Sequence, residues 1–239
     1  MIMRAIILAG GKGTRLKPYT YSLPKPLMPI GGEMPILEII LKQLKEHGFN
    51  HITMAVNYMA KIIKAFFGDG SEWGLKIDYS LEKKPLSTIG PLTVINDLPD
   101  NFLVMNGDIL TDINYRRFFN WHVEEQNEVT VATFKRSSKI DFGVLKYEEN
   151  REIFEFIEKP KYNFDVSMGI YAIKRSVIED LPKNEMYGFD ELMVDGINKG
   201  LKIKAFPHDS YWLDIGRADD YKTANKDYAE KKEKFLNTF

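Results

Sequence analysis

Short apolar runs recur along the first half of the chain, separated by stretches in which apolar side chains return every three or four residues. The runs are closed by Gly, Asn or Asp, which is typical of strands buried on both faces of a sheet. In the stretches between these runs, apolar side chains recur with the period of an α-helix. This alternation predicts an α/β fold with a mostly parallel central sheet flanked by helices. Strands are expected over residues 3–8, 51–56, 75–81, 102–105 and 129–134, and helices over residues 35–47, 59–67, 88–95 and 115–125.

The pattern changes near residue 135. Shorter strands with tight polar connections follow, as in a smaller mixed sheet or a lid. There is no internal repeat and no linker-like segment, so we expect a single domain over residues 1–239. Strands are expected here over residues 143–147, 153–157, 168–173, 201–206 and 211–215, the last two as a pair, and helices over residues 189–198 and 218–231.

Composition narrows the functions that this fold could serve. The net charge is −1, so no overall basic field favours nucleic acid or an anionic membrane. No stretch approaches the roughly 20 apolar residues of a membrane helix, and the apolar start is too short for a signal peptide. The absence of cysteine excludes disulfides and thiolate chemistry, and it suits a reducing cytoplasm, where we expect the protein. The histidines lack zinc-ligand spacing and are expected at surface or boundary positions: His47, His51, His122 and His208.

The long polar segment after the first expected strand, residues 9–32, carries the clearest chemistry. Loops of this length in a compact domain are usually functional or disordered. Glycines at the carboxyl end of a buried strand expose backbone N–H groups that can cradle phosphate oxygens. Arg15 and Lys25 add positive charge, and a proline on each side of Lys25 stiffens its backbone. An ordinary glycine-rich connection is the alternative, and it leaves the arginine and the proline-flanked lysine unexplained.

Two well-known phosphate loops do not fit this segment. The dinucleotide-binding loop reads Gly-x-Gly-x-x-Gly, but here Leu16 stands where the third glycine is needed. A P-loop places Ser or Thr after its Gly-Lys pair, but Gly13 follows Lys12. The segment therefore indicates phosphate binding of a different kind.

Two aspartates from distant parts of the sequence, Asp108 and Asp214, each follow an apolar strand. Ligands of open α/β sheets bind where strands end. A pair of carboxylates there suits magnesium, which prefers oxygen ligands and usually takes one or two carboxylates together with phosphates and water. Taken singly, either aspartate also fits an ordinary turn.

The motifs in combination point to a known family. Gly10-Gly11-x-Gly13-Thr14-Arg15-Leu16 is followed by Pro24-Lys25-Pro26-Leu27. This compound motif closely resembles the opening of the nucleoside-diphosphate-sugar pyrophosphorylases, which are sugar-1-phosphate nucleotidyltransferases. The resemblance runs nearly to the end of the chain through further motifs in the family's order: Glu82 to Gly90, Asn106-Gly107-Asp108, Phe142-Gly143-Val144, Glu158-Lys159-Pro160, Met168-Gly169-Ile170-Tyr171 and Trp212-Leu213-Asp214-Ile215-Gly216.

The resemblance implies a Rossmann-like nucleotidyltransferase core with a smaller mixed-sheet sugar-binding lobe. Residues 1–135 would mainly bind nucleotide, and residues 136–239 would mainly bind sugar phosphate and supply closing helices. The implied substrates are a nucleoside triphosphate and a hexose-type sugar 1-phosphate, the implied cofactor is Mg²⁺, and a homo-oligomer stays open. The implied site residues are Arg15 and Lys25 for catalysis; Leu8, Ala9, Gly10, Gly11, Gly13, Thr14, Glu82, Pro85, Ser87 and Thr88 for the nucleotide; Gly143, Glu158, Lys159 and Gly169 for the sugar phosphate; and Asp108 and Asp214 for the metal.

Glu82 bears on which base is read. In the thymidylyl branch of the family a glutamine near this point complements thymine or uracil, because an amide both donates and accepts. An ionised Glu82 only accepts, which suits the two adjacent donors of guanine. Together with Pro24-Lys25-Pro26-Leu27 and Gly90-Pro91-Leu92, this looks closest to the mannose-1-phosphate guanylyltransferases and implies GTP. The alternatives are dTTP, UTP or CTP, and Glu82 also fits a solvated residue at a strand end.

The chain departs from the family's usual pattern at three places. Ser87 and Ile89 are bulkier than the Gly and Ala that commonly stand in this turn, which affects contacts to the base. Ser167 stands where many members have asparagine, which affects hydrogen bonding to the sugar and hence its identity.

Two other classes of protein compete with this interpretation. A non-catalytic regulatory homologue would bind nucleotide sugars but should have lost part of the charged set, which is retained here. A metal-dependent glycosyltransferase should show Asp-x-Asp at the end of a strand, and Asn106-Gly107-Asp108 is not that motif.

Overall fold

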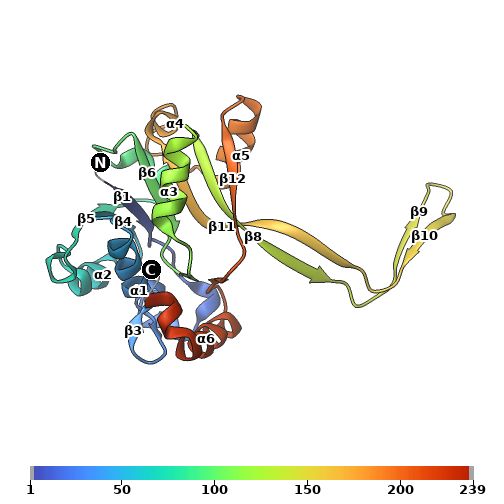
Figure 1. The fold of residues 1–239 in the computed structure, drawn as a ribbon, viewed down its shortest axis with the longest axis horizontal. Coiled ribbons are helices and arrows are strands. Elements are labelled where there is room, and N and C mark those ends of the chain that lie inside the picture. The colour runs from blue at the N-terminus through green and yellow to red at the C-terminus, as the bar shows by residue number, and fades with distance from the viewer. Residues whose placement is uncertain (1–2, 237–239) are drawn as a thin grey trace.

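The computed structural model describes residues 3–236 and is built on a seven-stranded sheet (Figure 1). Neighbouring strands run parallel except at β11, which is antiparallel to both of its neighbours. The predicted α/β fold with a mostly parallel sheet is therefore confirmed. The strand order is β12 (Ile203–His208), β8 (Val129–Lys139), β11 (Lys161–Lys174), β6 (Asn101–Asn106), β1 (Arg4–Leu8), β4 (His51–Val56) and β5 (Lys76–Leu81).

Both faces of the sheet are buried, because successive residues of a strand point to opposite sides. On β1, Ile7 packs into one apolar cluster and Ile6 into the other. The first cluster takes side chains from α1 (Ile36–Glu46), α2 (Ala60–Phe67), α3 (Tyr115–Glu124) and α6 (Ala218–Leu236). The second takes side chains from α4 (Arg175–Glu179), α5 (Phe189–Asn198) and a 3-10 helix (Gly90–Val94).

Short strand pairs complete the fold and correct part of the sequence prediction. They are β2 (Pro29–Ile30) with β3 (Met34–Pro35), β7 (Ile109–Thr111) with β13 (Trp212–Asp214), and β9 (Val144–Tyr147) with β10 (Ile153–Ile157). The expected pairing of residues 201–206 with 211–215 is wrong, since β12 pairs with β8 and β13 pairs with β7. The expected helix over residues 88–95 is the 3-10 helix at Gly90–Val94.

The outer parts of β8 and β11 leave the globular core as a long ribbon (Figure 1). Their antiparallel pairing continues from Ser167 opposite Thr133 to Lys161 opposite Lys139. The β9–β10 hairpin lies beyond that point and forms the small antiparallel sheet of the second half. We call residues 134–166 the arm. Its side chains are mostly exposed, unlike the inner halves of the same two strands.

None of the helices within residues 3–236 combines the length and the apolar character that a membrane crossing requires.

Candidate active site

Four parallel strands end at one edge of the sheet, and each leads into a residue that lines a cavity of about 570 Å³. β1, β4, β5 and β6 lead into Ala9, Asn57, Glu82 and Gly107, respectively. Ligands of open α/β sheets bind at this carboxyl edge. Backbone hydrogen bonds hold the four exits side by side: Ala9 N–H to Ala55 O at 2.8 Å, Gly107 N–H to Leu8 O at 3.0 Å, and Glu82 N–H to Val56 O at 3.0 Å.

The glycine-rich segment forms one wall of the cavity. Gly13 has φ 60°, a left-handed conformation that glycine adopts without strain, and a Cβ there would lie 2.9 Å from the Thr20 side chain. The Thr20 hydroxyl donates to the Gly13 carbonyl at 2.8 Å and fixes the turn. Exposed Thr14 and Arg15 follow on a short 3-10 helix. The segment is therefore ordered by its own contacts and presents backbone to the cavity.

Lys25 packs against this loop, where a Cβ on Gly13 would lie 3.3 Å from Lys25 Cβ, and its side chain is only 10% exposed. Its Nζ donates to Oδ2 of Asp108 and forms an ion pair with it. The flanking Pro24 and Pro26 limit the backbone around it, as expected from the sequence. The lysine is thus a fixed positive charge at the cavity wall rather than a mobile surface group.

Asp108 and Asp214 are brought together by the pairing of β7 with β13. Asp214 stands opposite Ile109, and the N–H of Ile215 donates to the Asp108 carbonyl at 3.1 Å. Burial and the charge of Asp108 raise the pKa of the Asp214 carboxyl, while Lys25 and Arg15 oppose this shift. Two carboxylates from distant parts of the chain therefore share one partly buried place, as the sequence predicts.

This pair of carboxylates suits a divalent cation. Asp108 Oδ1 is buried and has no hydrogen-bond partner among the described residues. The repulsion that raises the pKa of Asp214 is what a cation would relieve. No group of three or more acidic or histidine side chains within residues 3–236 could hold a metal. Two carboxylates with the remaining positions left to phosphate and water are typical of Mg²⁺ rather than of a closed protein site.

Glu82 lies at the far end of the cavity, beside the glycine-rich loop. A Cβ on Gly10 would come within 2.9 Å of Glu82 Oε1, and Glu82 Oε2 accepts the N–H of Leu86 at 3.4 Å. Burial raises the pKa of this carboxyl, and the bond from Leu86 opposes that shift. The carboxylate therefore faces the cavity from a partly dry position.

The turn after Glu82 also lines the cavity. Ser87 has φ 66°, and the Thr88 hydroxyl accepts the N–H of Phe189 at 2.8 Å, at the start of α5. The nucleotide residues expected from the sequence all line the cavity: Leu8, Ala9, Gly10, Gly11, Gly13, Thr14, Glu82, Pro85, Ser87 and Thr88.

The expected sugar-phosphate residues fall into two groups. Gly169 belongs to the core, where φ 72° and Asn106, whose Nδ2 would be 2.6 Å from an added Cβ, require glycine. Gly143, Glu158 and Lys159 meet on the arm: a Cβ on Gly143 would lie 3.2 Å from Glu158 Oε2, and Lys159 pairs with Glu158 at 3.6 Å. None of the described residues that line the cavity comes from the arm.

Sequence reasoning missed several residues of the cavity wall, including Lys12, Asn57 and Asn106. Asn57 and Asn106 stand at the carboxyl ends of β4 and β6, so the rule that ligands bind at that edge could have found them. The same reasoning placed all four histidines at surface or boundary positions. This is wrong for His47 and His122, which are 3% and 0% exposed.

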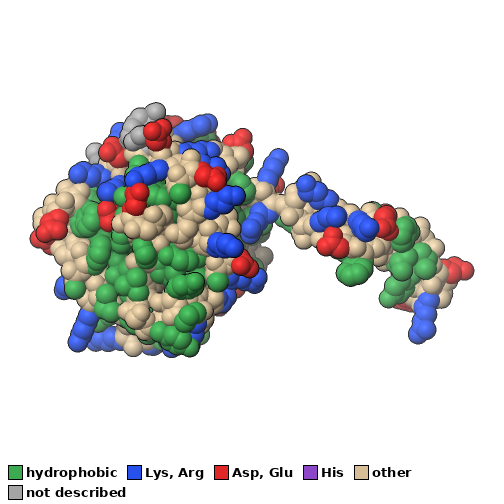
Figure 2. All heavy atoms as spheres, turned by 90° about the horizontal axis from the view of Figure 1, so that it is seen from below, with side chains coloured by type: hydrophobic (Ala, Val, Ile, Leu, Met, Phe, Trp, Pro, Cys, Tyr) green, Lys and Arg blue, Asp and Glu red, His purple; other side chains and the backbone are tan. Residues whose placement is uncertain are grey.

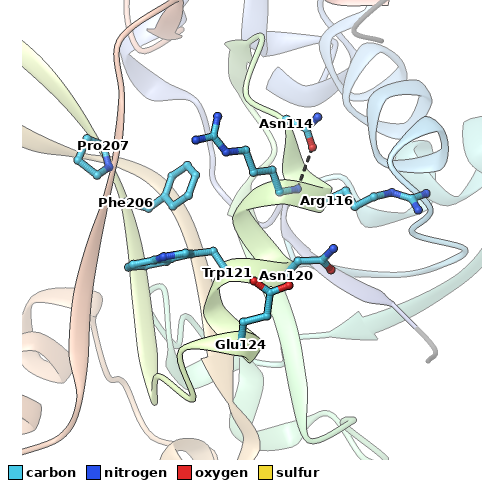
Figure 3. Close-up of a pocket in the computed structure, with 8 residues that line it drawn as sticks. Asn114, Arg116, Asn120, Trp121, Glu124, Phe206 and Pro207 are labelled. Carbon is cyan, nitrogen blue, oxygen red and sulfur yellow. Dashed lines mark hydrogen bonds between the residues drawn. The ribbon is translucent and has the colours of Figure 1, made fainter.

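A second hollow of about 640 Å³ lies over α3 and β12 (Figure 3). Its lining includes Arg117, whose guanidinium stands over the Phe206 ring at 5.9 Å, and Trp121, which packs against the same ring. It contains neither Asp108 nor Asp214. The glycine-rich loop and Asp108 line the cavity at the sheet edge instead, and Asp214 stands beside Asp108, so that cavity is the better candidate for chemistry.

A comparison with protein families shows which family the chain belongs to. The family model described as "Nucleotidyl transferase" matches residues 4–231, which include the loop, both aspartates and the arm. The chain belongs to the nucleotidyl transferase family.

Curated relatives of this chain differ in the base that their names specify. It is 33% identical over 92% of its length to a UTP–glucose-1-phosphate uridylyltransferase of Synechocystis, and 32% identical over 93% to a mannose-1-phosphate guanylyltransferase of Mycobacterium tuberculosis. The chain spans only 61% and 64% of those two proteins. It is 34% identical over 92% of its length to a D-glycero-α-D-manno-heptose 1-phosphate guanylyltransferase of Campylobacter jejuni, and spans 97% of that protein.

A solved structure shows the same fold. HddC from Yersinia pseudotuberculosis is 26% identical, with a TM-score of 0.73, and the match covers 95% of this chain and all of that chain. The same protein has also been solved in complex with GMP-PN.

Proposed function

We propose that this chain transfers a nucleotidyl group from a nucleoside triphosphate, preferably GTP, to a hexose-type sugar 1-phosphate and releases pyrophosphate. The observation that carries the proposal is the meeting of Asp108, Asp214 and Lys25 beside a glycine-rich loop. This arrangement combines cation ligands, a fixed positive charge and backbone donors around one cavity. Phosphoryl chemistry needs these three elements and no protein nucleophile.

The reaction is an in-line displacement at the α-phosphorus of the triphosphate. An oxygen of the sugar phosphate forms the new P–O bond while the bond from the α-phosphorus to the pyrophosphate oxygen breaks. The sugar phosphate is already an anion at neutral pH, so no protein base is required. Catalysis then depends on alignment and on neutralising the charge that gathers on pyrophosphate.

Each charged residue has a role in that displacement. Lys25 and Arg15 offset charge on the triphosphate and on the departing pyrophosphate. Asp108 and Asp214 hold Mg²⁺, which supplies further neutralisation of the two phosphate groups when it is bound. Lys159 binds the sugar phosphate and Glu158 its hydroxyls, because an ammonium group suits phosphate and a carboxylate accepts from hydroxyl groups.

The preference for GTP rests on Glu82. Its carboxylate faces the cavity and can accept from the adjacent N1–H and N2 amino donors of guanine. Two of the three curated relatives named above carry guanylyltransferase names, which is consistent with this preference. The uridylyltransferase relative supports a second candidate, the same reaction with UTP, and dTTP and CTP belong in the same test.

Pyrophosphate release measured over a matrix of nucleoside triphosphates and sugar 1-phosphates tests the proposal. GTP with one sugar phosphate should give the highest turnover, and Asp108→Asn and Asp214→Asn should each remove most of it. Asp209→Asn, an exposed aspartate, is the matched control and should leave turnover unchanged. Binding of GTP and sugar phosphate without any pyrophosphate release would identify a regulatory homologue instead.

A further inference from the structure

The arm exposes an unusual concentration of large apolar side chains. Among the described residues, nine of the seventeen large hydrophobic side chains that are exposed lie on it. Phe142 is 77% exposed, Tyr147 64% and Phe154 63%. Figure 2 shows apolar side chains gathered toward the outer part of the arm. The other exposed members are Ile140, Leu145, Ile153, Phe156, Tyr162 and Phe164.

At the β9–β10 hairpin these side chains form one face. Leu145 stands opposite Phe156, and Tyr147 stands opposite Ile153, so all four project from the same side of the hairpin. The other side carries the ion pair of Lys146 with Glu155. A two-stranded hairpin with a bare apolar face is at best marginally stable in water. We therefore expect the apolar face of the β9–β10 hairpin to be buried against another protein surface.

The exposed area is large enough for a protein partner. At 150–250 Å² for each aromatic side chain, Phe142, Tyr147, Phe154, Phe156 and Phe164 together expose on the order of 600 Å². The aliphatic side chains of the arm bring this close to the ~800 Å² that each partner buries in a stable interface. Summed along the arm, this area is at or above the roughly 300–600 Å² of the largest apolar patch on a typical monomer.

The arm also carries residues that its own cavity lacks. Gly143, Glu158 and Lys159 lie together on it, and Glu158 and Lys159 are more than half exposed. Seven consecutive strand pairs, from Ser167–Thr133 to Lys161–Lys139, run as one ladder away from the core, a reach of about 20 Å. A second copy of the chain offers both a matching arm and an open cavity, so a twofold arrangement satisfies both at once.

We propose that two copies of this chain exchange arms, so that the arm of each covers the cavity of the other. The apolar face of the β9–β10 hairpin is buried against the second copy, and Glu158 and Lys159 complete its sugar-phosphate site. The part played by these two residues rests on the proposed function; the exchange itself rests on the exposed face and the direction of the arm.

Light scattering of the purified chain tests the association. The wild type should have the mass of a dimer. The double variant Leu145→Glu/Phe156→Glu should be a monomer with an unchanged thermal transition, because these residues lie outside both core clusters. Ile197→Glu, at a residue of α5 that is 64% exposed, is the matched control and should stay dimeric. A monomeric wild type would overturn the proposal.

Mixing two variants with complementary defects tests the exchange. Asp108→Asn damages the cavity and keeps the arm, whereas Lys159→Ala damages the arm and keeps the cavity. Co-refolded in equal amounts, they should recover about one quarter of wild-type turnover at low sugar phosphate, since half of the dimers are mixed and each has one intact site. No recovery from a dimeric mixture would mean that each arm serves its own chain, and arm exchange would be wrong.

A cross-link separates this proposal from the proposed function. The chain has no cysteine, so one preparation can carry Lys12→Cys at the cavity and another Lys159→Cys on the arm. After co-refolding, a short bis-maleimide should join the two chains into a covalent dimer on a denaturing gel. A dimer that cross-links but turns over no substrate pair would sink the proposed function alone. A dimer that does not cross-link between chains would sink the exchange alone.

Discussion

In the proposed reaction, the carboxylate of Glu82 is the group expected to select the base of the nucleoside triphosphate. Its Oε2 accepts the N–H of Leu86, which fixes one oxygen, while Oε1 lies beside Gly10 at the cavity wall. Burial raises the pKa of the carboxyl, so the charge is held in a place where an unmatched partner is unfavourable. A base that presents an acceptor to this carboxylate would meet repulsion rather than a hydrogen bond.

Replacing Glu82 by glutamine should weaken the preference for GTP and favour dTTP or UTP. The amide can donate to O4 and accept from N3–H of thymine or uracil, whereas the carboxylate can only accept. The ratio of kcat/KM for GTP to kcat/KM for UTP should fall by about 5- to 150-fold, which corresponds to about 1–3 kcal/mol of transition-state discrimination. Steady-state kinetics with both nucleotides measures it. A wild type that prefers UTP, dTTP or CTP would contradict the assignment of the base.

At the scale of elements, Asp112 ties the last part of the chain to the sheet. It follows β7, its side chain is 6% exposed, and it accepts hydrogen bonds from three segments. Burial works against its ionisation, but these bonds and Lys234 hold its pKa well below the usual range. The partners are His208 at 2.8 Å, Ser210 at 2.6 Å, the Tyr211 N–H at 2.9 Å and Lys234 of α6 at 3.0 Å.

Asp112→Asn should lower the free energy of unfolding by about 3 kcal/mol at pH 7, because it leaves Lys234 without its partner and replaces an acceptor by a donor. A carboxyl with a lowered pKa stabilises the fold above its ordinary pKa, and that contribution is lost as pH falls through the folded value. The difference between wild type and variant should therefore shrink below about pH 4. Urea unfolding at both pH values measures it. Asp141→Asn, at an exposed ion pair on the arm, is the control and should change stability by less than about 1 kcal/mol.

His122 of α3 gives a second element-scale prediction, with the same sign in pH as Asp112 but in a higher pH range. Its ring is fully buried and bonds to Thr130 at 2.8 Å and to Asn101 at 3.1 Å. Burial, helped by the charge of Lys174, lowers its pKa to about 4. In this pH range the unfolded chain therefore binds a proton at His122 that the native state does not bind. The free energy of unfolding falls as pH drops from 6.5 toward 4.

His122→Gln cannot titrate and should flatten this loss, which amounts to about 3 kcal/mol in the wild type. The slope of unfolding free energy against pH, from urea titrations between pH 7 and 4, measures it. An unchanged slope in the variant would show that another group dominates acid unfolding.

These elements also show what the sequence can predict. Strands such as β1 and helices such as α1 bury continuous or periodic apolar faces, so their patterns are unambiguous. β7 has only three residues, and its pairing with β13 is a contact over a hundred residues of sequence, which periodicity does not record. The outer half of β11 alternates polar and apolar residues, as a strand does, and the sequence prediction, which began this strand at residue 168, overlooked that alternation.

The same division holds for the whole molecule. Asp108 and the glycine-rich loop stand directly after strands and line the cavity, as the rule that ligands bind at strand ends predicts. Asp214 comes beside Asp108 through the pairing of β13 with β7. The motif around Lys159 could also be recognised in the sequence, but its position on an arm outside the globular core could not be predicted. It depends on how far a two-stranded ribbon continues beyond the sheet, which long-range pairing and a covering partner decide.

Lys25 and Lys159 should divide the catalytic work between the core and the arm. Lys25 is buried in the cavity wall beside Asp108, where its charge is fixed before the reaction begins. Its loss should mainly lower kcat, by about 10²–10³-fold, as removal of one group that stabilises transition-state charge commonly does. Lys159 is 55% exposed on the arm. Under the proposed exchange it would reach a sugar phosphate only when an arm covers the cavity. Lys159→Ala should therefore raise the KM for sugar phosphate and leave the KM for nucleotide nearly unchanged. Lys146→Ala, at another exposed lysine of the arm, is the control and should change neither constant. Initial rates with each substrate varied in turn separate the two effects, and the reverse pattern would mean that the two lysines serve the opposite phosphates.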